Sequence, residues 1–203
     1  MSALPEHYIT EQEYLDGERI SDIKHEYVAG QVYAMTGASA NHNFIVASLI
    51  GTSLQALKGK KCKVMPSDMK VSIPRKKSYF YPDVSIVCGD LWIGDQYRDV
   101  LLNPTIIFEV LSPSTEAFDR SKKFEAYRSI PSLREYILVA QHRVYIEQYV
   151  RQAHNQWNLI IINDIDAMLE LTSIQTTLSV REIYAQVEFD PASDDDDDVT
   201  KDE

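Results

Sequence analysis

The sequence has little glycine and little cysteine, and these shortages exclude several kinds of site. Only seven of the 203 residues are glycine. They form no Gly-rich phosphate-binding loop, no dinucleotide-binding fingerprint and no Gly-x-Ser-x-Gly nucleophile elbow. The two cysteines, Cys62 and Cys88, form no Cys-x-x-Cys pair. We therefore expect two free thiols in the core of a reduced protein, rather than a zinc site or a disulfide framework.

Long apolar runs are also missing. No run reaches the roughly 18 residues that a membrane-spanning helix requires. Residues 1–10 do not combine a basic region with an apolar stretch, as a signal peptide would. These absences predict a cytoplasmic protein that does not enter a membrane.

Positive charge is in short supply as well. The formal net charge is −11, of which −6 belongs to residues 191–203, with seven acids and one lysine, and −5 remains for the rest. We expect one globular domain over residues 1–189 and a disordered acidic tail over residues 190–203. A mildly acidic body is not the usual footprint of a nucleic-acid-binding protein, although residues 70–77 contain a local basic cluster.

Hydrophobic periodicity predicts a mixture of strands and helices, and hence an α/β (or α+β) sheet core covered by helices. Helices are expected over residues 10–18, 42–57, 118–128 and 178–184, with Thr10 and Asn41 as N-caps of the first two. A hairpin is expected over residues 23–36, turning at Ala29-Gly30. Strands are expected over residues 62–73, 82–88, 104–111, 133–139, 143–150, 157–162 and 167–171. The first of these is expected to be one long or bent strand, with Pro66 marking an edge or a bulge.

Two neighbouring strands of this pattern each carry one carboxylate. Asp83 begins the strand Asp83-Val84-Ser85-Ile86-Val87, and Glu109 lies inside Ile106-Ile107-Phe108-Glu109-Val110-Leu111. A carboxylate in an apolar strand costs several kcal/mol unless its charge is compensated. Oxygen ligands from two strands suit a hard divalent cation such as Mg²⁺, so a metal is one possible compensator.

These strands belong to a set of short motifs spread over residues 10–185. The motifs are Lys24-His25-Glu26-Tyr27, Gly37-Ala38-Ser39, Asn41-His42-Asn43, Ser67-Asp68-Met69, Tyr81-Pro82-Asp83-Val84-Ser85, Glu109-Val110-Leu111-Ser112-Pro113, Lys123-Phe124 and Ile130-Pro131-Ser132-Leu133-Arg134-Glu135-Tyr136. Together they resemble the Uma2 family (DUF820) of restriction-endonuclease-like proteins in the PD-(D/E)XK nuclease superfamily. The resemblance implies an αβββαβ core and metal-dependent hydrolysis of nucleic-acid phosphodiester bonds. Beyond that core, we expect extra C-terminal antiparallel strands.

The resemblance also implies roles for particular residues. Asp83 and Glu109 would hold one or two Mg²⁺ (or Mn²⁺) ions, and the backbone carbonyl of Val110 would face the metal. Glu26 in the hairpin and His42 at a helix start are further catalytic candidates, although residues of these types at such places are more often simply exposed.

The sequence departs from the wider nuclease pattern at Leu111. This position, two residues after the motif acid, normally holds the catalytic lysine on the same face of the strand. The resemblance implies that the following helix supplies the lysine instead, from Lys122 or Lys123. At about 100° per residue, Lys123 lies at the edge of the face that Phe124 presents to the sheet, whereas Lys122 faces solvent. We therefore favour Lys123 and keep Lys122 as the alternative.

Each candidate also has a purely structural explanation. An aspartate after a proline commonly caps a turn, and Glu109 paired with Lys123 would make a buried salt bridge that only stabilises the fold. The alternative function is accordingly a catalytically inactive nucleic-acid-binding or oligomerisation module of the same fold. We expect nucleic acid as the partner, DNA before RNA, although no residue distinguishes the two. A homodimer is expected only by analogy with nucleases that cut two strands.

Overall fold

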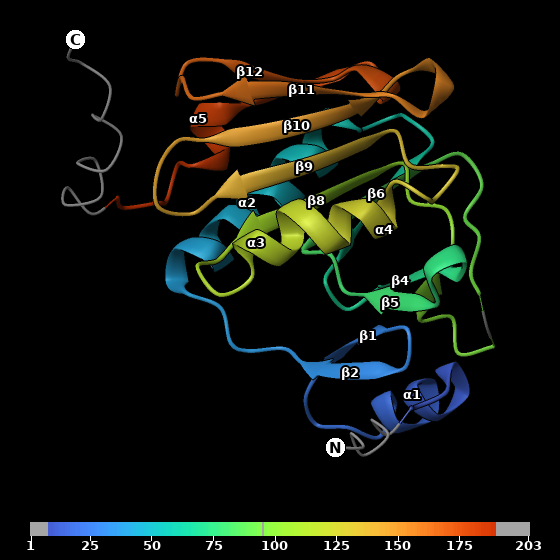
Figure 1. The fold of residues 1–203 in the computed structure, drawn as a ribbon. Coiled ribbons are helices and arrows are strands. Elements are labelled where there is room, and N and C mark those ends of the chain that lie inside the picture. Colours follow the sequence, from blue (N-terminus) through green and yellow to red (C-terminus); the bar gives the residue numbers. More distant parts are fainter. Residues whose placement is uncertain (1–7, 95, 190–203) are drawn as a thin grey trace, which may run out of the picture.

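The centre of the molecule is a six-stranded mixed sheet in the order β11-β10-β9-β8-β6-β3 (Figure 1). It is seen in a computed structural model that describes residues 8–94 and 96–189. The strands are β3 (Cys62–Pro66), β6 (Val84–Cys88), β8 (Ile106–Leu111), β9 (Glu135–Ala140), β10 (Ile146–Arg151) and β11 (Trp157–Ile162). Strands β8 and β9 pair in parallel, and the other neighbours are antiparallel. A parallel pair needs a crossover connection, which is helical here.

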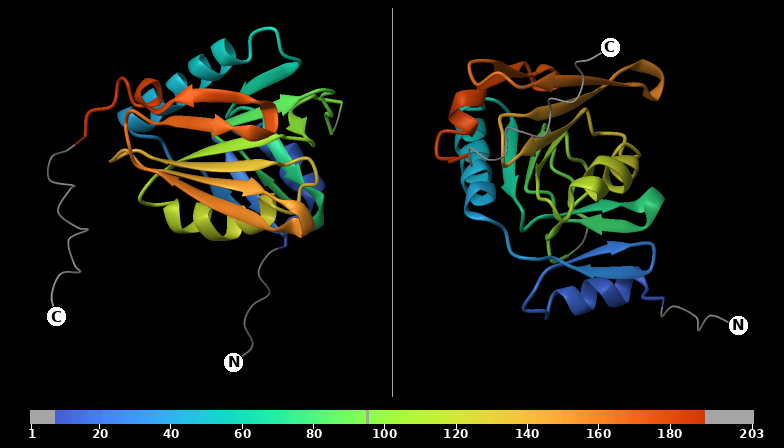
Figure 2. Two further views of the ribbon diagram at one scale, coloured as in Figure 1. Left: turned by 90° about the horizontal axis from the view of Figure 1, so that it is seen from above. Right: turned by 60° about the vertical axis from the view of Figure 1, so that its left-hand side comes forward.

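Helical segments cover both faces of this sheet (Figure 2). One face packs against α2 (Ala40–Ala56), α5 (Val180–Ile183) and the hairpin of β12 (Met168–Leu171) and β13 (Thr176–Ser179). The other face packs against the crossover, which consists of α3 (Glu116–Phe118), the π-helical segment η2 (Asp119–Lys123) and α4 (Phe124–Tyr127). Side chains alternate along a strand, so Phe108 and Val110 enter the first core and Ile107 and Leu111 the second. Glu109 therefore points toward the crossover.

A second sheet, in the order β2-β1-β5-β4-β7, lies on the crossover side. Its strands are β1 (His25–Val28), β2 (Gln31–Ala34), β4 (Lys70–Ile73), β5 (Ser78–Phe80) and β7 (Val100–Leu101). Helix α1 (Glu11–Glu18) packs Tyr14 against Tyr27 and Tyr79 of this sheet. Phe80 in turn contacts the ring of Tyr127 on α4, so the second sheet reaches the same core as the crossover. Short 3₁₀ turns complete the described elements: η1 (Pro74–Lys76), η3 (Ala153–Asn155) and η4 (Thr172–Ile174).

The predicted fold class is confirmed. The αβββαβ core is formed by α2, β3, β6, β8, the crossover and β9, and antiparallel strands follow it at the C-terminal side. Thr10 caps α1 as predicted, and the hairpin turns at Ala29 and Gly30, both with positive φ. The acidic tail lies outside the described residues, and one domain over residues 1–189 stays a prediction. Within the described part, no helix is long and apolar enough to span a membrane.

The prediction of one strand over residues 62–73 is wrong. The structure divides this segment into β3 of the six-stranded sheet and β4 of the second sheet. Pro66 ends β3, and the amide of Met69 donates to its carbonyl at 3.2 Å, which closes a turn. In β3 only Met65 is buried, whereas all four residues of β4 are, and the sequence pattern alone did not assign the two strands to different sheets.

Two helix boundaries also differ from the prediction. Helix α2 is capped by Ser39, whose hydroxyl accepts from the amide of His42 at 3.1 Å, and Asn41 lies inside the helix. The helix predicted over residues 178–184 is shorter, because β13 continues through Ser179 before α5 begins. Both serines satisfy exposed amides of a first helical turn, as N-caps do.

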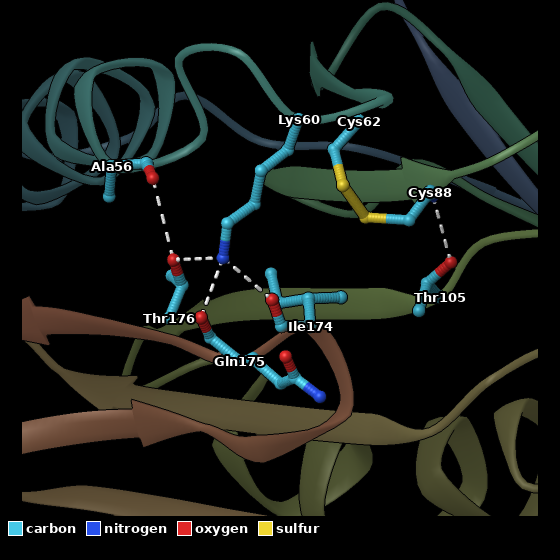
Figure 3. The surroundings of a disulfide bond; sticks show 8 residues. All are labelled: Ala56, Lys60, Cys62, Cys88, Thr105, Ile174, Gln175 and Thr176. Atoms are coloured by element: carbon cyan, nitrogen blue, oxygen red, sulfur yellow. Dashed lines mark hydrogen bonds between the residues drawn. A yellow bond between two sulfur atoms is a disulfide. The ribbon is translucent and has the colours of Figure 1, made fainter.

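The prediction of free thiols at Cys62 and Cys88 is wrong as well. The structure joins them in a disulfide between directly paired positions of β3 and β6 (Figure 3). The register of this antiparallel pair, which the sequence did not reveal, brings the two side chains together. Nearby, the ammonium group of Lys60 donates to the carbonyls of Ile174 and Gln175 at 2.9 and 2.6 Å and thereby fastens the η4 turn to the end of α2 (Figure 3).

Candidate functional site

Asp83 and Glu109 are brought together by the register of β6 and β8. Val84 pairs with Phe108, so Asp83, just before β6, lies beside Glu109. The amide of Val110 donates to Oδ2 of Asp83 at 2.7 Å. This bond ties the first predicted carboxylate to the strand that carries the second.

Glu109 meets Lys123 and Tyr127 from the crossover. Its Oε1 lies 3.2 Å from Nζ of Lys123 and accepts the hydroxyl of Tyr127 at 3.0 Å. Lys123 is the last residue of the π-helical segment η2, and π-helical turns within α-helices are often found at functional sites. The structure buries Lys123 and exposes Lys122, as helix geometry predicted.

Lys123 has two further carboxylate partners. Oε1 of Glu26, on β1, lies 2.9 Å from its Nζ, and Oδ1 of Asp119 lies 3.2 Å from it. Glu26 also accepts from the amide of Tyr81 at 3.4 Å. Strand β1 of the second sheet thus places Glu26 beside Lys123, although the sequence alone suggests that a carboxylate in this hairpin is exposed.

His42 reaches the site from the first turn of α2. Its Nε2 lies 3.3 Å from Oδ1 of Asp83. Its Nδ1 is buried and has no hydrogen-bond partner among the described residues. The five predicted catalytic side chains are therefore gathered in one place.

Gln141 is a residue of this region that the sequence did not reveal. Its side-chain amide donates to the carbonyl of Leu111 at 2.9 Å, and its Oε1 accepts the hydroxyl of Ser39. It fastens the end of β8 to the start of α2, and so holds Glu109 and His42 in register. The contact joins residues about a hundred positions apart, so no local pattern could have shown it.

We call Glu26, Asp83, Glu109, Asp119 and Lys123 the acid–lysine cluster. It holds four carboxylates and one lysine, with His42 beside it. Burial raises the pKa of Glu109 well above its usual value, and Asp119, Asp83 and Glu26 add to this, although Lys123 opposes it. Burial by itself would lower the pKa of Lys123, but its carboxylate neighbours raise it well above the ordinary value. The cluster thus keeps its ammonium charged and has negative charge in excess.

The donor atoms of the cluster suit a hard cation. Oε2 of Glu109 makes no hydrogen bond within residues 8–94 and 96–189, and Asp83 offers further oxygens beside it, whereas a role for the Val110 carbonyl stays a prediction. In the same described part, no three His, Cys, Asp or Glu side chains gather as a metal-binding group. An ion here would therefore rest on two carboxylates and a backbone carbonyl, with water or substrate oxygens completing its shell, as Mg²⁺ commonly does.

Comparison with known proteins identifies the family and the fold of the chain. A family model described as "Uma2: Putative restriction endonuclease" matches residues 11–182. The uncharacterized protein slr1290 of Synechocystis sp. is 37% identical over 89% of this chain and 94% of its own length, and sll1609 of the same organism is 34% identical over 81% and 93%. The crystal structure of a "putative nuclease belonging to DUF820" from Anabaena variabilis shares the fold, with a TM-score of 0.72 at 15% identity over 87% of this chain and 98% of that chain.

Proposed function

The chain belongs to the Uma2 family, whose members carry a nuclease fold, and on that premise we propose that it is a metal-dependent endonuclease that hydrolyses nucleic-acid phosphodiester bonds. The observation that carries the proposal is the acid–lysine cluster, where three carboxylates surround one protonated lysine and a fourth, Asp83, is bound to the strand of Glu109. Such an excess of buried negative charge is costly unless a cation or a proton compensates it.

Asp83, Glu109 and the carbonyl of Val110 would hold Mg²⁺ or Mn²⁺. When bound, the ion would polarise the scissile phosphate and lower the pKa of a bound water. The Val110 amide and His42 orient Asp83 from its two sides. Tyr127 fixes Oε1 of Glu109, which leaves Oε2 for the ion.

Lys123 is proposed to stabilise negative charge that develops on the phosphate. Its ammonium is held by Glu26 and Asp119, which act as positioning residues, and it remains protonated at neutral pH. Preorganised charge in a site with little water stabilises a transition state strongly, because no rearrangement is needed at the moment of reaction. His42 lies beside Asp83, with its Nε2 3.3 Å from Oδ1 of that carboxylate, and would help to orient it.

A second candidate is a nucleic-acid-binding module without catalysis. It is favoured by the three carboxylate partners of Lys123, an arrangement that would also serve as a purely structural ion cluster. The two candidates differ in one measurable way. A nuclease needs the divalent ion for cleavage, whereas a binding module associates with nucleic acid equally well in EDTA.

The experiment is cleavage of supercoiled plasmid and of labelled DNA and RNA oligonucleotides, with Mg²⁺ or Mn²⁺ against EDTA. Asp83→Asn and Glu109→Gln should each lower the rate by roughly 10³-fold or more, as removal of a group that acts in the transition state does. Asp90→Asn and Glu170→Gln make the same chemical changes at exposed positions and should leave the rate unchanged. Metal-dependent cleavage retained by Asp83→Asn would remove this residue from the site, and cleavage by none of the proteins would favour the binding module.

A further inference from the structure

A pocket of about 360 Å³ lies between the end of α4 and η1, the turn between β4 and β5. It is lined by Arg75 and Lys76 from η1, Arg128 after α4 and Arg151 at the end of β10. Glu125 is the one acidic side chain of its lining. Four cations and one carboxylate give this pocket a local charge of +3 in a chain whose formal net charge is −11.

Two of these cations are available to a ligand. Arg75 and Arg128 are exposed, and neither guanidinium makes a hydrogen bond or ion pair within residues 8–94 and 96–189. Lys76 is paired with Glu125 at 2.6 Å, which neutralises the carboxylate of the lining. The uncompensated charge of the pocket therefore rests on its arginines.

Arg151 is the third arginine of the pocket, and hydrogen bonds hold its guanidinium in place. It donates to the carbonyls of Arg128, Ile130 and Leu133 at 2.5 to 2.9 Å and to the side chain of Asn155 at 2.9 Å. These bonds hold a charged guanidinium against the pocket without cancelling its charge, because no carboxylate takes part. Its role is to set the electrostatic potential of the wall, whereas Arg75 and Arg128 remain free to contact a ligand directly.

The ligand that fits this chemistry is a phosphate group. A guanidinium is planar and donates two parallel hydrogen bonds, which match the oxygens of a phosphate. The basic segment at residues 70–77 supplies only part of the pocket, since Lys70 is buried and pairs with Asp99 instead. The fold adds Arg128 and Arg151 from distant parts of the chain.

The pocket is connected to the acid–lysine cluster through α4. Lys123 and Tyr127 face the cluster, whereas Glu125 and Arg128 face the pocket. Lys123 and Arg128 are five residues apart, which is about 7.5 Å along an α-helix. We propose that the pocket binds a backbone phosphate of the nucleic-acid strand and positions a neighbouring phosphodiester at the cluster. The inference rests on the proposed function and names a phosphate subsite for its substrate.

The test is binding of fluorescein-labelled single-stranded and duplex DNA oligonucleotides in EDTA, measured by fluorescence anisotropy over a range of KCl concentrations. EDTA prevents cleavage, so the readout does not depend on catalysis. The double variant Arg75→Ala/Arg128→Ala should bind at least about tenfold more weakly than the wild type. The slope of log K against log[KCl] should fall by about two, one for each phosphate that the variant no longer neutralises.

The matched control is Lys58→Ala/Lys63→Ala, which removes two exposed positive charges away from the pocket, at the end of α2 and on β3. It should keep the wild-type salt slope. Equal effects of the two double variants, or no binding of either probe by the wild type, would overturn the subsite. Failure of the proposed function looks different: binding would still depend on Arg75 and Arg128, but no metal-dependent cleavage would occur.

Discussion

Two lysines are buried among the described residues, and their surroundings differ in charge balance. Lys70 is 3% exposed, and its Nζ lies 2.7 Å from one carboxylate, that of Asp99. Lys123 is 6% exposed and lies within 3.2 Å of three carboxylates of the acid–lysine cluster. The first is a lysine with one carboxylate, which Arg19 also approaches at 3.6 Å, whereas the second is a cation outnumbered by acids.

The difference separates a structural ion pair from a candidate site. A buried lysine that is not outnumbered by carboxylates leaves no surplus of negative charge to be compensated. A buried surplus of carboxylates keeps a demand for positive charge, which a proton on Glu109 or a divalent ion would meet. Burial of charge alone is therefore weak evidence of function, and imbalance of buried charge is stronger evidence.

The largest effect on stability is expected from removing the lysine of the unbalanced cluster. Lys123→Met leaves buried carboxylates without their cation and should cost about 3–5 kcal/mol of unfolding free energy in EDTA at pH 7. Lys70→Met should cost less, about 1–2 kcal/mol, because the Asp99 side chain is 28% exposed and Nε of Arg19 lies 3.6 Å from it. Urea denaturation of the two variants measures both values, and equal losses would contradict the distinction between the two lysines.

The next largest effect on stability is expected from binding of the divalent ion. Mg²⁺ or Mn²⁺ should stabilise the wild type by about 2.7 kcal/mol at a concentration a hundred times its Kd. Asp83→Asn and Glu109→Gln should lose this stabilisation, whereas Lys70→Met should keep it. Thermal denaturation in MgCl₂ or MnCl₂, against KCl of equal ionic strength, provides the measurement. An undiminished shift in Asp83→Asn would place the ion elsewhere.

The strands that carry the acid–lysine cluster could be predicted from the sequence. The run Ile106-Ile107-Phe108-Glu109-Val110-Leu111 is apolar except for one acid, and it forms β8 as predicted. Helix geometry separated Lys123 from Lys122, because orientation around a helix depends only on spacing. Motif spacing and local periodicity thus anticipated which side chains would meet.

Features that depend on long-range register were out of reach of the sequence. The disulfide of Cys62 and Cys88 and the clamp formed by Gln141 each join segments whose pairing only the folded sheet defines. Pro66 indicated an edge or a bulge, but not that the chain passes there from one sheet to another. The pocket lined by arginines could not be predicted either, since Arg128 and Arg151 approach η1 only after the strands have paired. Local patterns predict elements well, and they predict contacts between elements only where a family motif links them.

A smaller effect is expected from pH. The pKa of Glu109 is raised in the folded protein, so its contribution to stability is fully present below the ordinary value of 4.5 and is lost as pH rises through the raised pKa. Unfolding free energy in EDTA should therefore decrease on going from pH 5 upward, by at most about 1.4 kcal/mol per pH unit for this one proton. Glu109→Gln should flatten this part of the profile, and Glu170→Gln, at an exposed position, should not. A wild-type profile that rises over this range would contradict the assignment.

The smallest effect on stability and cleavage is expected from replacing Lys122, an exposed lysine with which the two buried lysines can be compared. Its side chain is exposed and forms no ion pair within the described part of the chain. Lys122→Ala should change stability by no more than about 0.5 kcal/mol and leave metal-dependent cleavage within about twofold of wild type. Lys123→Met, one residue away on the same helical segment, should abolish cleavage. Because Lys122→Ala leaves the acid–lysine cluster intact, a loss of cleavage in this variant at unchanged stability would transfer the catalytic role to Lys122 and leave Lys123 as a structural ion, like Lys70.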